Sequence, residues 1–358
     1  MNSAPRSSRA RLLRLIAFGA LACAGMQGLC AKNYWSRASG DWNSDIWATI
    51  PGTSPVEGLR PGVEDSANLG LTGATITFSN PVHVHEFSLR ADNVRAVITP
   101  GADVRWHRFF GQRDRNAKGG YNGVVEMLGG KLLVEDRFII AGYAQGDIGR
   151  GTFHQKGGEV TLLGALHLTQ FAVTGTSIAT GIYSLSGGTL NIPTNDEHLG
   201  GIRSGIGKGR FEWDGGTLNC TRFFGNIHNA GSGNLSPGGD GEVGLSILHA
   251  LKPKVYAQSW NASMTVDIAS DTKYDRLFWQ AAGGSQAIIR KESMFKIYLL
   301  NGYQPAPGTS FDVIVADRLT VEGNLRLGGS DGKYFTCEKV KVGNEEIFRL
   351  TYRGRRAE

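Results

Sequence analysis

A repeat with a period of about 28 residues constrains this chain more than any other feature of its sequence. Four segments align on a glycine, followed two residues later by an apolar side chain and six residues later by a Gly-Gly pair. Their first glycines are Gly123, Gly151, Gly181 and Gly209, so successive copies begin at nearly equal intervals. Such even spacing is typical of a chain that folds as stacked, similar units.

Within each repeat, apolar residues two apart mark one face of a β-strand. The Gly-Gly pair interrupts that alternation, as expected at a corner that needs positive φ or close backbone approach. One repeat is then several short strands joined at bends, and it buries its apolar stripe only against another copy. We therefore expect an all-β fold, a parallel β-helix or β-solenoid with coils of about 28 residues over 73–235. The alternative is a β-sandwich of repetitive hairpins, which explains the alternation but not the even spacing.

The two flanks of the repeat region have different patterns. Residues 32–72 hold Trp35, Trp42 and Trp47 among turn residues. We interpret this segment as an N-terminal cap over the open first coil, with a carbohydrate-stacking platform as the alternative. Beyond the repeats the period stops, and alternating runs at irregular spacing predict an antiparallel β region over 236–358.

The first 31 residues have the layout of a secretory signal peptide. Four arginines, with no acidic residue among them, precede an apolar run from Leu15 to Ala24, and cleavage after Ala24 or after Ala31 fits the pattern. The run is too short to span a bilayer as a helix. We therefore expect residues 1–31 to be removed and the rest to be exported to the periplasm, the cell surface or the medium, without becoming an integral membrane protein.

The net charge argues against a nucleic-acid partner once this leader is set aside. The whole chain has 38 Lys and Arg against 32 Asp and Glu, a formal charge of +6. Four of the arginines belong to the leader, so the exported body has 34 basic and 32 acidic residues. A nearly neutral body outside the cytoplasm gives little reason to expect nucleic-acid binding.

Cysteines and histidines give no strong sign of a metal site. Only Cys220 and Cys337 lie beyond the leader, without zinc-ligand spacing. Buried thiols are the favoured interpretation, and a disulfide between the two in an oxidising compartment is the alternative. His83 and His85 share one face of a strand, but the sequence locates no third ligand. We expect neither a metal nor a cofactor.

The densest basic stretch of the body is a candidate ligand-binding region. Arg105, Trp106 and Arg108 begin a basic and aromatic run that continues to Arg113 and Arg115. Such a run suits contact with an acidic polysaccharide. The alternative is a loop inserted between coils, with its aromatic side chains tucked in.

Aligned repeats also place chemically active side chains in outward columns. Glu126, His154, Ser184 and Glu212 share one column, in which Glu126 and His154 have acid–base capacity and join the candidate ligand-binding set. The alternative is a solvated face on which charges pair across coils. The sequence has no nucleophile elbow, P-loop, zinc-protease motif or EF-hand loop, so we assign no catalytic residue.

Several segments carry a resemblance to a known family. They are the opening NYW, GDW and EDSANLG, the repeated GGTLN, the junction LSPGG and the tail LLNGYQPAPGTSFDVI. Together they resemble bacterial exported β-helix proteins with autotransporter-associated β-strand repeats, often found as PEP-CTERM-type surface proteins. The resemblance covers most of residues 32–327 and implies a β-helix at the cell surface rather than an activity. It does not extend to a translocator barrel or to an apolar anchor before the final RGRRAE.

These observations predict a non-enzymatic, exported β-solenoid that acts as a cell-surface, matrix or adhesion component. The alternative is a polysaccharide-active enzyme, a lyase or glycosidase, or a glycan-binding module on the same fold. The regular repeat with capped ends favours the first, and the basic, aromatic run favours the second. Polysaccharide and other envelope components are the expected partners.

Overall fold

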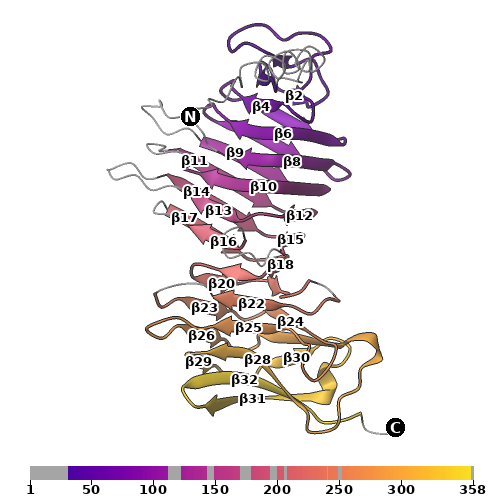
Figure 1. The fold of residues 1–358 in the computed structure, drawn as a ribbon, viewed down its shortest axis with the longest axis vertical. Coiled ribbons are helices and arrows are strands. Elements are labelled where there is room, and N and C mark those ends of the chain that lie inside the picture. The colour runs from indigo at the N-terminus through magenta and orange to yellow at the C-terminus, as the bar shows by residue number, and fades with distance from the viewer. Residues whose placement is uncertain are drawn as a thin grey trace, which may run out of the picture.

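The fold is a parallel β-solenoid. The computed structural model describes residues 31–111, 122–142, 149–169, 179–193, 200–204, 208–239, 241–248 and 252–355. Within these residues, about nine coils of about 29 residues stack along the long axis of the molecule (Figure 1). This confirms the predicted fold class, a β-solenoid followed by antiparallel pairing near the C-terminus. No helix among the same residues is long and apolar enough to cross a membrane.

Each coil contributes strands to three walls. In the described part of the chain, the first wall consists of a seven-stranded sheet and, further along, a four-stranded sheet. The seven strands are β2 (Gly40–Asp41), β5 (Thr75–Phe78), β7 (Val94–Ile98), β9 (Asn122–Met127), β11 (Arg150–Gln155), β14 (Thr180–Leu185) and β17 (Lys208–Trp213). The four are β20 (Ile227–Asn229), β23 (Val255–Gln258), β26 (Gln286–Ile289) and β29 (Arg318–Val321).

The second and third walls belong to one sheet, in which early coils use single long strands. These are β6 (Val82–Leu89), β8 (Asp103–Phe110) and β10 (Lys131–Ala141). Later coils split the path in two, because β10 pairs first with β12 and then with β13. The second wall continues as β12 (Glu159–Leu162), β15 (Thr189–Ile192), β18 (Thr217–Cys220), β21 (Asn234–Leu235), β24 (Ser263–Ile268), β27 (Met294–Leu299) and β30 (Arg326–Gly328). The third continues as β13 (Leu166–Thr169), β16 (Ile202–Ser204), β19 (Arg222–Phe223), β22 (Leu245–Leu248), β25 (Arg276–Trp279) and β28 (Ser310–Ala316).

The predicted corner glycines lie between the first and second walls. The second glycine of each pair has positive φ, +74° at Gly130 and +73° at Gly158. A Cβ atom on Gly158 would lie 2.4 Å from the carbonyl oxygen of Gly130 in the preceding coil. Any other residue would be both strained and in collision there, which explains why the pair recurs in every repeat.

Inward side chains of successive coils stack into one continuous core. The rings of Phe153 and Tyr183 lie 5.0 Å apart, and the Tyr183 hydroxyl donates a 2.6 Å hydrogen bond to Oε1 of Gln155. Phe211 follows in the same column, 5.7 Å from Tyr183, but it is only half-buried. Burial of apolar surface, which stabilises a fold by about 25 cal/mol per Å², makes the largest contribution to the free energy that holds the coils together.

Tryptophans close the N-terminal end of this core. Trp42 and Trp47 are buried with their ring centroids 4.7 Å apart, and Trp42 stacks on Phe78 at 5.1 Å. These two rings are therefore unavailable as a platform for sugars, whereas Trp35 is half-buried, with the Arg90 guanidinium 5.6 Å from its ring centroid. The assignment of 32–72 as an N-terminal cap stays a prediction. Around the two buried rings lie β1 (Asn33–Ser36), β3 (Trp47–Ala48) and β4 (Ser66–Leu69), with β1 antiparallel to β3 and parallel to β4.

The antiparallel region is smaller than the expected 236–358, because parallel coils continue far beyond the last Gly-Gly repeat. Ser263 pairs in parallel with Asn234 and with Met294, which in turn pairs with Arg326. Among the described residues at this end, antiparallel partners are β28, β32 (Glu345–Tyr352) and β31 (Phe335–Val342), near the short 3-10 turns η1 (Leu300–Gly302) and η2 (Gly332–Tyr334). The alternating pattern of a strand is the same in parallel and antiparallel pairing, so the sequence did not distinguish them. In these later coils, Asn261 (φ +64°) and Glu292 (φ +62°) provide left-handed backbone near the corner between the first and second walls.

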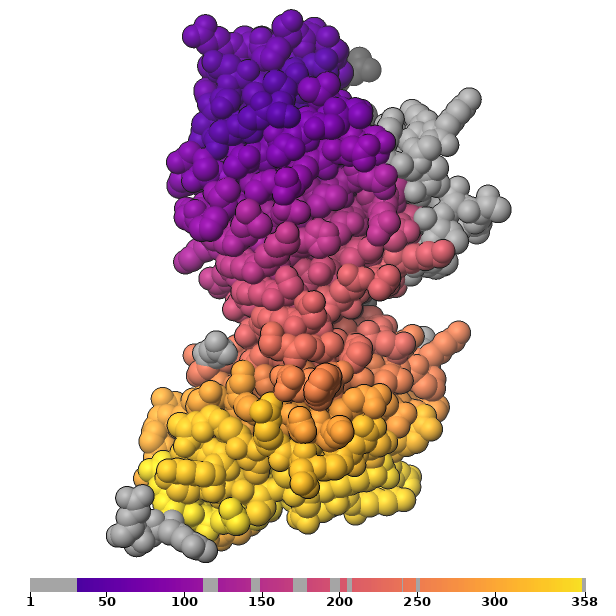
Figure 2. All heavy atoms as spheres, turned by 180° about the vertical axis from the view of Figure 1, so that it is seen from behind, coloured from indigo at the N-terminus to yellow at the C-terminus, as the bar shows by residue number. Residues whose placement is uncertain are grey.

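One coil is much shorter than the others and forms a neck. Ser232 Oγ donates a hydrogen bond to the carbonyl oxygen of Asp214, which lies only 18 residues earlier in the chain. In the next coil, the bond from Ser263 Oγ to Asn234 Oδ1 spans 29 residues. Figure 2 shows the molecule narrowing around the short coil. Just after it, residues 236–239 and 241–244, which we call the junction, lie between β21 and β22. The neck is therefore where the regular stack is interrupted.

Candidate functional site

The predicted basic run is tied into ion pairs between coils. Arg105 Nε donates a 2.6 Å hydrogen bond to Glu135 Oε1, and Arg108 Nε donates one of 2.8 Å to Asp136 Oδ2. Glu135 also lies 3.2 Å from Nδ1 of His107. Burial alone would raise the pKa of Glu135, but the hydrogen bonds from Arg105 and His107 lower it. These cations hold neighbouring coils together.

Trp106, a predicted ligand contact, is buried in the core, with 0% of its surface exposed. Its ring stacks on Phe87 at 4.7 Å and on Phe109 at 5.1 Å. The alternation along β8 turns Trp106 inward between the outward Arg105 and His107, so this prediction is corrected. Arg113 and Arg115, the other predicted residues of the run, lie outside the described residues.

The second predicted group is in register but on another wall. Glu126 and His154 are cross-strand partners on β9 and β11 of the first wall. The Glu126 carboxylate accepts a hydrogen bond from Arg95 and lies 3.7 Å from Lys156 Nζ. The Arg95 hydrogen bond is the main cause of a lowered pKa for Glu126. A carboxylate held ionised suits cross-coil pairing better than proton donation at neutral pH.

Histidines and cysteines form no metal site in the described part of the chain. His85 stacks on His107 at 4.6 Å, but no group of three or more potential metal ligands gathers among those residues. Cys220 and Cys337 are free thiols, buried and half-buried respectively. Burial raises the pKa of Cys220 to about 12, so its thiol stays protonated at neutral pH.

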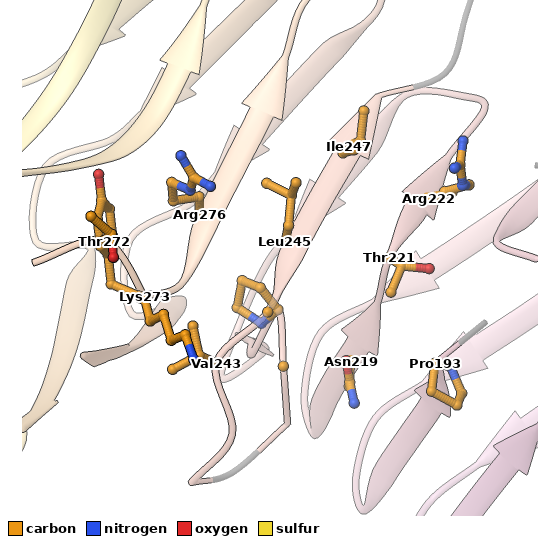
Figure 3. A pocket seen from close by; sticks show the side chains of 14 residues that line it. Pro193, Asn219, Thr221, Arg222, Val243, Leu245, Ile247, Thr272, Lys273 and Arg276 are labelled. Atoms are coloured by element: carbon orange, nitrogen blue, oxygen red, sulfur yellow. The ribbon is translucent and has the colours of Figure 1, made fainter. Parts of the chain in front are cut away.

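A groove at the neck was not identified from the sequence. Its volume is about 580 Å³, and it is lined by residues from four successive coils, the first of which contributes only Pro193, as Figure 3 shows. Asn219, Thr221 and Arg222 contribute from the second coil, the junction and β22 from the third, and the turn before β25 from the fourth. The short coil and the junction that follows it thus create a hollow on an otherwise regular surface.

The groove carries charge of one sign. Among the described residues that line it are Arg222, Lys273 and Arg276, and none of those residues is an Asp or a Glu. The Arg276 guanidinium lies 5.4 Å from the ring centroids of both Tyr274 and Phe278. Within the described residues, no carboxylate forms an ion pair with Lys273 or Arg276. These two cations are therefore available to a ligand, unlike Arg105 and Arg108.

Two buried carboxyl groups fix the frame of this groove. Asp275 Oδ1 accepts a 2.7 Å hydrogen bond from Gly244 N, and its Oδ2 accepts one of 3.1 Å from Asp267 N. Asp267 Oδ2 accepts a 2.9 Å bond from Gly241 N. Burial raises the pKa of Asp275 to about 8, with repulsion from Asp267 adding to the effect. Both carboxyl groups hold the junction against β24 and β25.

A second cavity borders the junction. It measures about 420 Å³ and is lined by Asp267, Lys296 and Tyr298, among others. Its lining combines an acid with a base, so it has no single preference for anions or cations. The neck groove is the more selective of the two sites.

The groove residues are far apart in sequence, which explains why pattern reasoning missed them. Coil pairing brings them together, since Arg222 lies opposite Ile247 and Leu245 lies opposite Arg276. The repeat has ended at this point, so no periodic signal marks them. The LSPGG junction motif was the visible sign that the architecture changes here.

No protein-family model matches the chain, and no curated protein matches it. The class of the molecule is therefore defined by its own geometry: it is a parallel β-solenoid with a cationic groove at its neck.

Proposed function

We propose that the protein is an exported β-solenoid that acts without catalysis as a cell-surface, matrix or adhesion component. The observation that carries this proposal is the use of outward charges on the walls. Glu126 lies between Arg95 and Lys156 of the two adjacent coils, and Arg290 Nη1 lies 3.2 Å from Glu322 of the next coil. Side chains committed to joining coils favour a load-bearing rod over a reaction centre.

The ends of the rod support the same proposal. Buried tryptophans cover the first coils, and the β28, β32 and β31 pairing covers the last. Covered ends keep a stacked β protein soluble, because no open coil remains to pair with the end of another molecule. The leader-like segment 1–31, of which residues 1–30 lie outside the described residues, is the basis for proposing export.

Fractionation of cells that express the full chain tests this proposal. We expect the protein in the extracellular or envelope fraction, accessible to protease added to intact cells. A variant without residues 1–31 is the control and should stay in the cytoplasm. Retention of the full chain in the cytoplasm would contradict the proposal.

The enzymatic alternative is tested separately with purified protein and a panel of acidic and neutral polysaccharides. We expect no release of reducing or unsaturated sugar ends. Turnover that is abolished by Glu126→Gln or His154→Gln, with the fold intact by circular dichroism, would make the protein an enzyme and replace the structural role.

A further inference from the structure

We propose that the neck groove binds a segment of an acidic polysaccharide, with the polymer's carboxylates paired to Lys273 and Arg276. The inference rests on the proposed function only for the place where the protein would meet such a polymer. Neither the basic run at Arg105 nor the column at Glu126 takes part in the groove.

The cations of the groove are poised for anions. Lys273 is exposed, and Arg276 is half-exposed with its guanidinium beside two aromatic rings. Among the described residues, the lining holds no carboxylate that would compete with an incoming anion for these two cations. A guanidinium matches a carboxylate with two parallel hydrogen bonds, and an ammonium adds a mobile point charge.

The rest of the lining matches a sugar ring better than a simple ion. Leu245 and Ile247 are half-buried and offer apolar surface, while Asn219 and Thr272 offer an amide and a hydroxyl (Figure 3). A uronic acid presents apolar C–H faces, hydroxyl groups and one carboxylate, so each type of lining group has a partner. The volume of about 580 Å³ lies within the range of ordinary ligand pockets.

Two other polymers fit less well. A nucleic acid needs aromatic faces for its bases, and the ring of Tyr274 in the lining already has Arg276 beside it at 5.4 Å. An extended peptide needs a free strand edge, yet β22 pairs with both β19 and β25, and β25 also pairs with β28. The groove lies on the face of a sheet whose edges are occupied.

The backbone that carries the cations is ordered before a ligand arrives. The turn that carries Lys273 is closed by a 2.8 Å hydrogen bond from Ala269 N to Lys273 O and by the antiparallel bridge between Ile268 and Tyr274. Asp275 lies directly before Arg276, and its carboxyl group accepts hydrogen bonds from the backbone N–H groups of Gly244 and Asp267. These bonds fix the start of β25. Preorganisation of this kind reduces the entropy lost on binding.

The test is a titration of the purified full chain with polygalacturonate, using dextran as a neutral polymer and inorganic polyphosphate as a second polyanion. We expect saturable binding to polygalacturonate that weakens with added salt, and none to dextran. The variant Lys273→Gln/Arg276→Gln should lose at least about tenfold in affinity for polygalacturonate. A melting curve of the variant confirms that its fold is intact.

The matched control is Lys291→Gln/Lys341→Gln, which removes two exposed positive charges outside the groove. It should retain the wild-type affinity. Equal losses in both variants would reduce the effect to net charge and overturn the proposal, as would no binding by the wild type. Binding of polyphosphate with a greater dependence on Lys273 and Arg276 than polygalacturonate shows would overturn the assignment to a uronate polymer. None of these outcomes depends on where the cell places the protein.

Discussion

The coils before the neck and the coils after it build the same three walls by different means. Before the neck, four successive corners between the first and second walls use a Gly-Gly pair, and Gly130, Gly158, Gly188 and Gly216 all have positive φ. After the neck, the left-handed residues near the same corner are Asn261, Glu292 and the single glycine Gly323. The comparison teaches that visible periodicity comes from corner chemistry, while the solenoid itself needs only alternating strands of compatible length.

The interiors differ as well. The first half is filled by stacked rings such as Phe138, Phe153 and Tyr183. The second half contains more buried polar groups, for example the Tyr256 hydroxyl bonded to Gln258 Oε1 at 3.0 Å and Asn234 Nδ2 bonded to Thr265 Oγ1 at 3.0 Å. Satisfied polar groups add modestly to stability but cost more when one partner is lost. The second half therefore depends on matched pairs and the first on bulk apolar contact.

The largest expected effect is that of Phe153→Ala in the aromatic stack. Removing a fully buried ring should cost about 3–5 kcal/mol. Because coils interact with nearest neighbours, hydrogen exchange should accelerate in the coils of β9 to β17 and change little in those of β23 to β28. Half-buried Phe211→Ala is the milder control. Equal acceleration in both halves would show that the neck does not separate them.

The corner glycines come next. Gly158→Ala combines a strained φ of +73° with a Cβ only 2.4 Å from a backbone oxygen and should cost about 2–4 kcal/mol in urea unfolding. Gly73→Ala is matched in φ at +76° but has nothing within 4 Å, so it should cost only about 1 kcal/mol. After the neck, Asn261→Gly should be nearly neutral. A similar cost at Gly158 and Gly73 would mean that close stacking is not what selects the glycine pair.

The buried carboxyl group of the second half makes its stability depend on pH. The pKa of Asp275 is about 8 in the folded protein and 3.8 in an unfolded chain, so the folded state retains a proton that the unfolded state has released. Its contribution to stability is complete below pH 4 and is lost as pH rises toward 8, by on the order of 2 kcal/mol or more. Asp275→Asn should remove this slope in thermal melts between pH 4 and pH 8. The control is Asp214→Asn, at an exposed residue of the first half, which should leave the pH dependence of melting unchanged. If Asp275→Asn also left it unchanged, Asp275 would not be the group responsible.

The smallest effect concerns the cross-coil ion pairs. A double-mutant cycle with Arg105→Gln and Glu135→Gln should give a coupling energy below about 1 kcal/mol, since both groups are partly exposed. The coupling should fall further at 0.5 M salt. A coupling of several kcal/mol would mean that surface charges, not the apolar core, set the stability of the first half.

Sequence reasoning recovered what depends on local periodicity. The column Glu126–His154–Ser184–Glu212 is in register as aligned, because each of its residues pairs with the next across neighbouring coils. It did not recover the direction of pairing after the neck, because an alternating strand carries no label for parallel or antiparallel neighbours. The period also drifts there, since Tyr256 pairs with Ala287 and Ala287 with Leu319, at longer intervals than those between the Gly-Gly copies.

The candidate site shows the same limit. Arg105 and Arg108 were found by local charge density, yet the structure gives each a carboxylate partner. Lys273 and Arg276 attracted no attention because nothing in their neighbourhood repeats and their counterpart Arg222 lies two coils earlier. Only coil register brings them into one groove. Charge density in the sequence therefore pointed to residues that pair between coils, and it did not point to the neck groove.

The parallel ladders also determine how the rod responds to force. Their hydrogen bonds run along the long axis, so a pull on the two ends loads the coils in series and opens them one at a time. Each coil of about 29 residues frees roughly 100 Å of chain while giving up one strand spacing of about 4.8 Å. A solenoid under load can therefore lengthen in steps, one coil at a time, before the attachments at its two ends break.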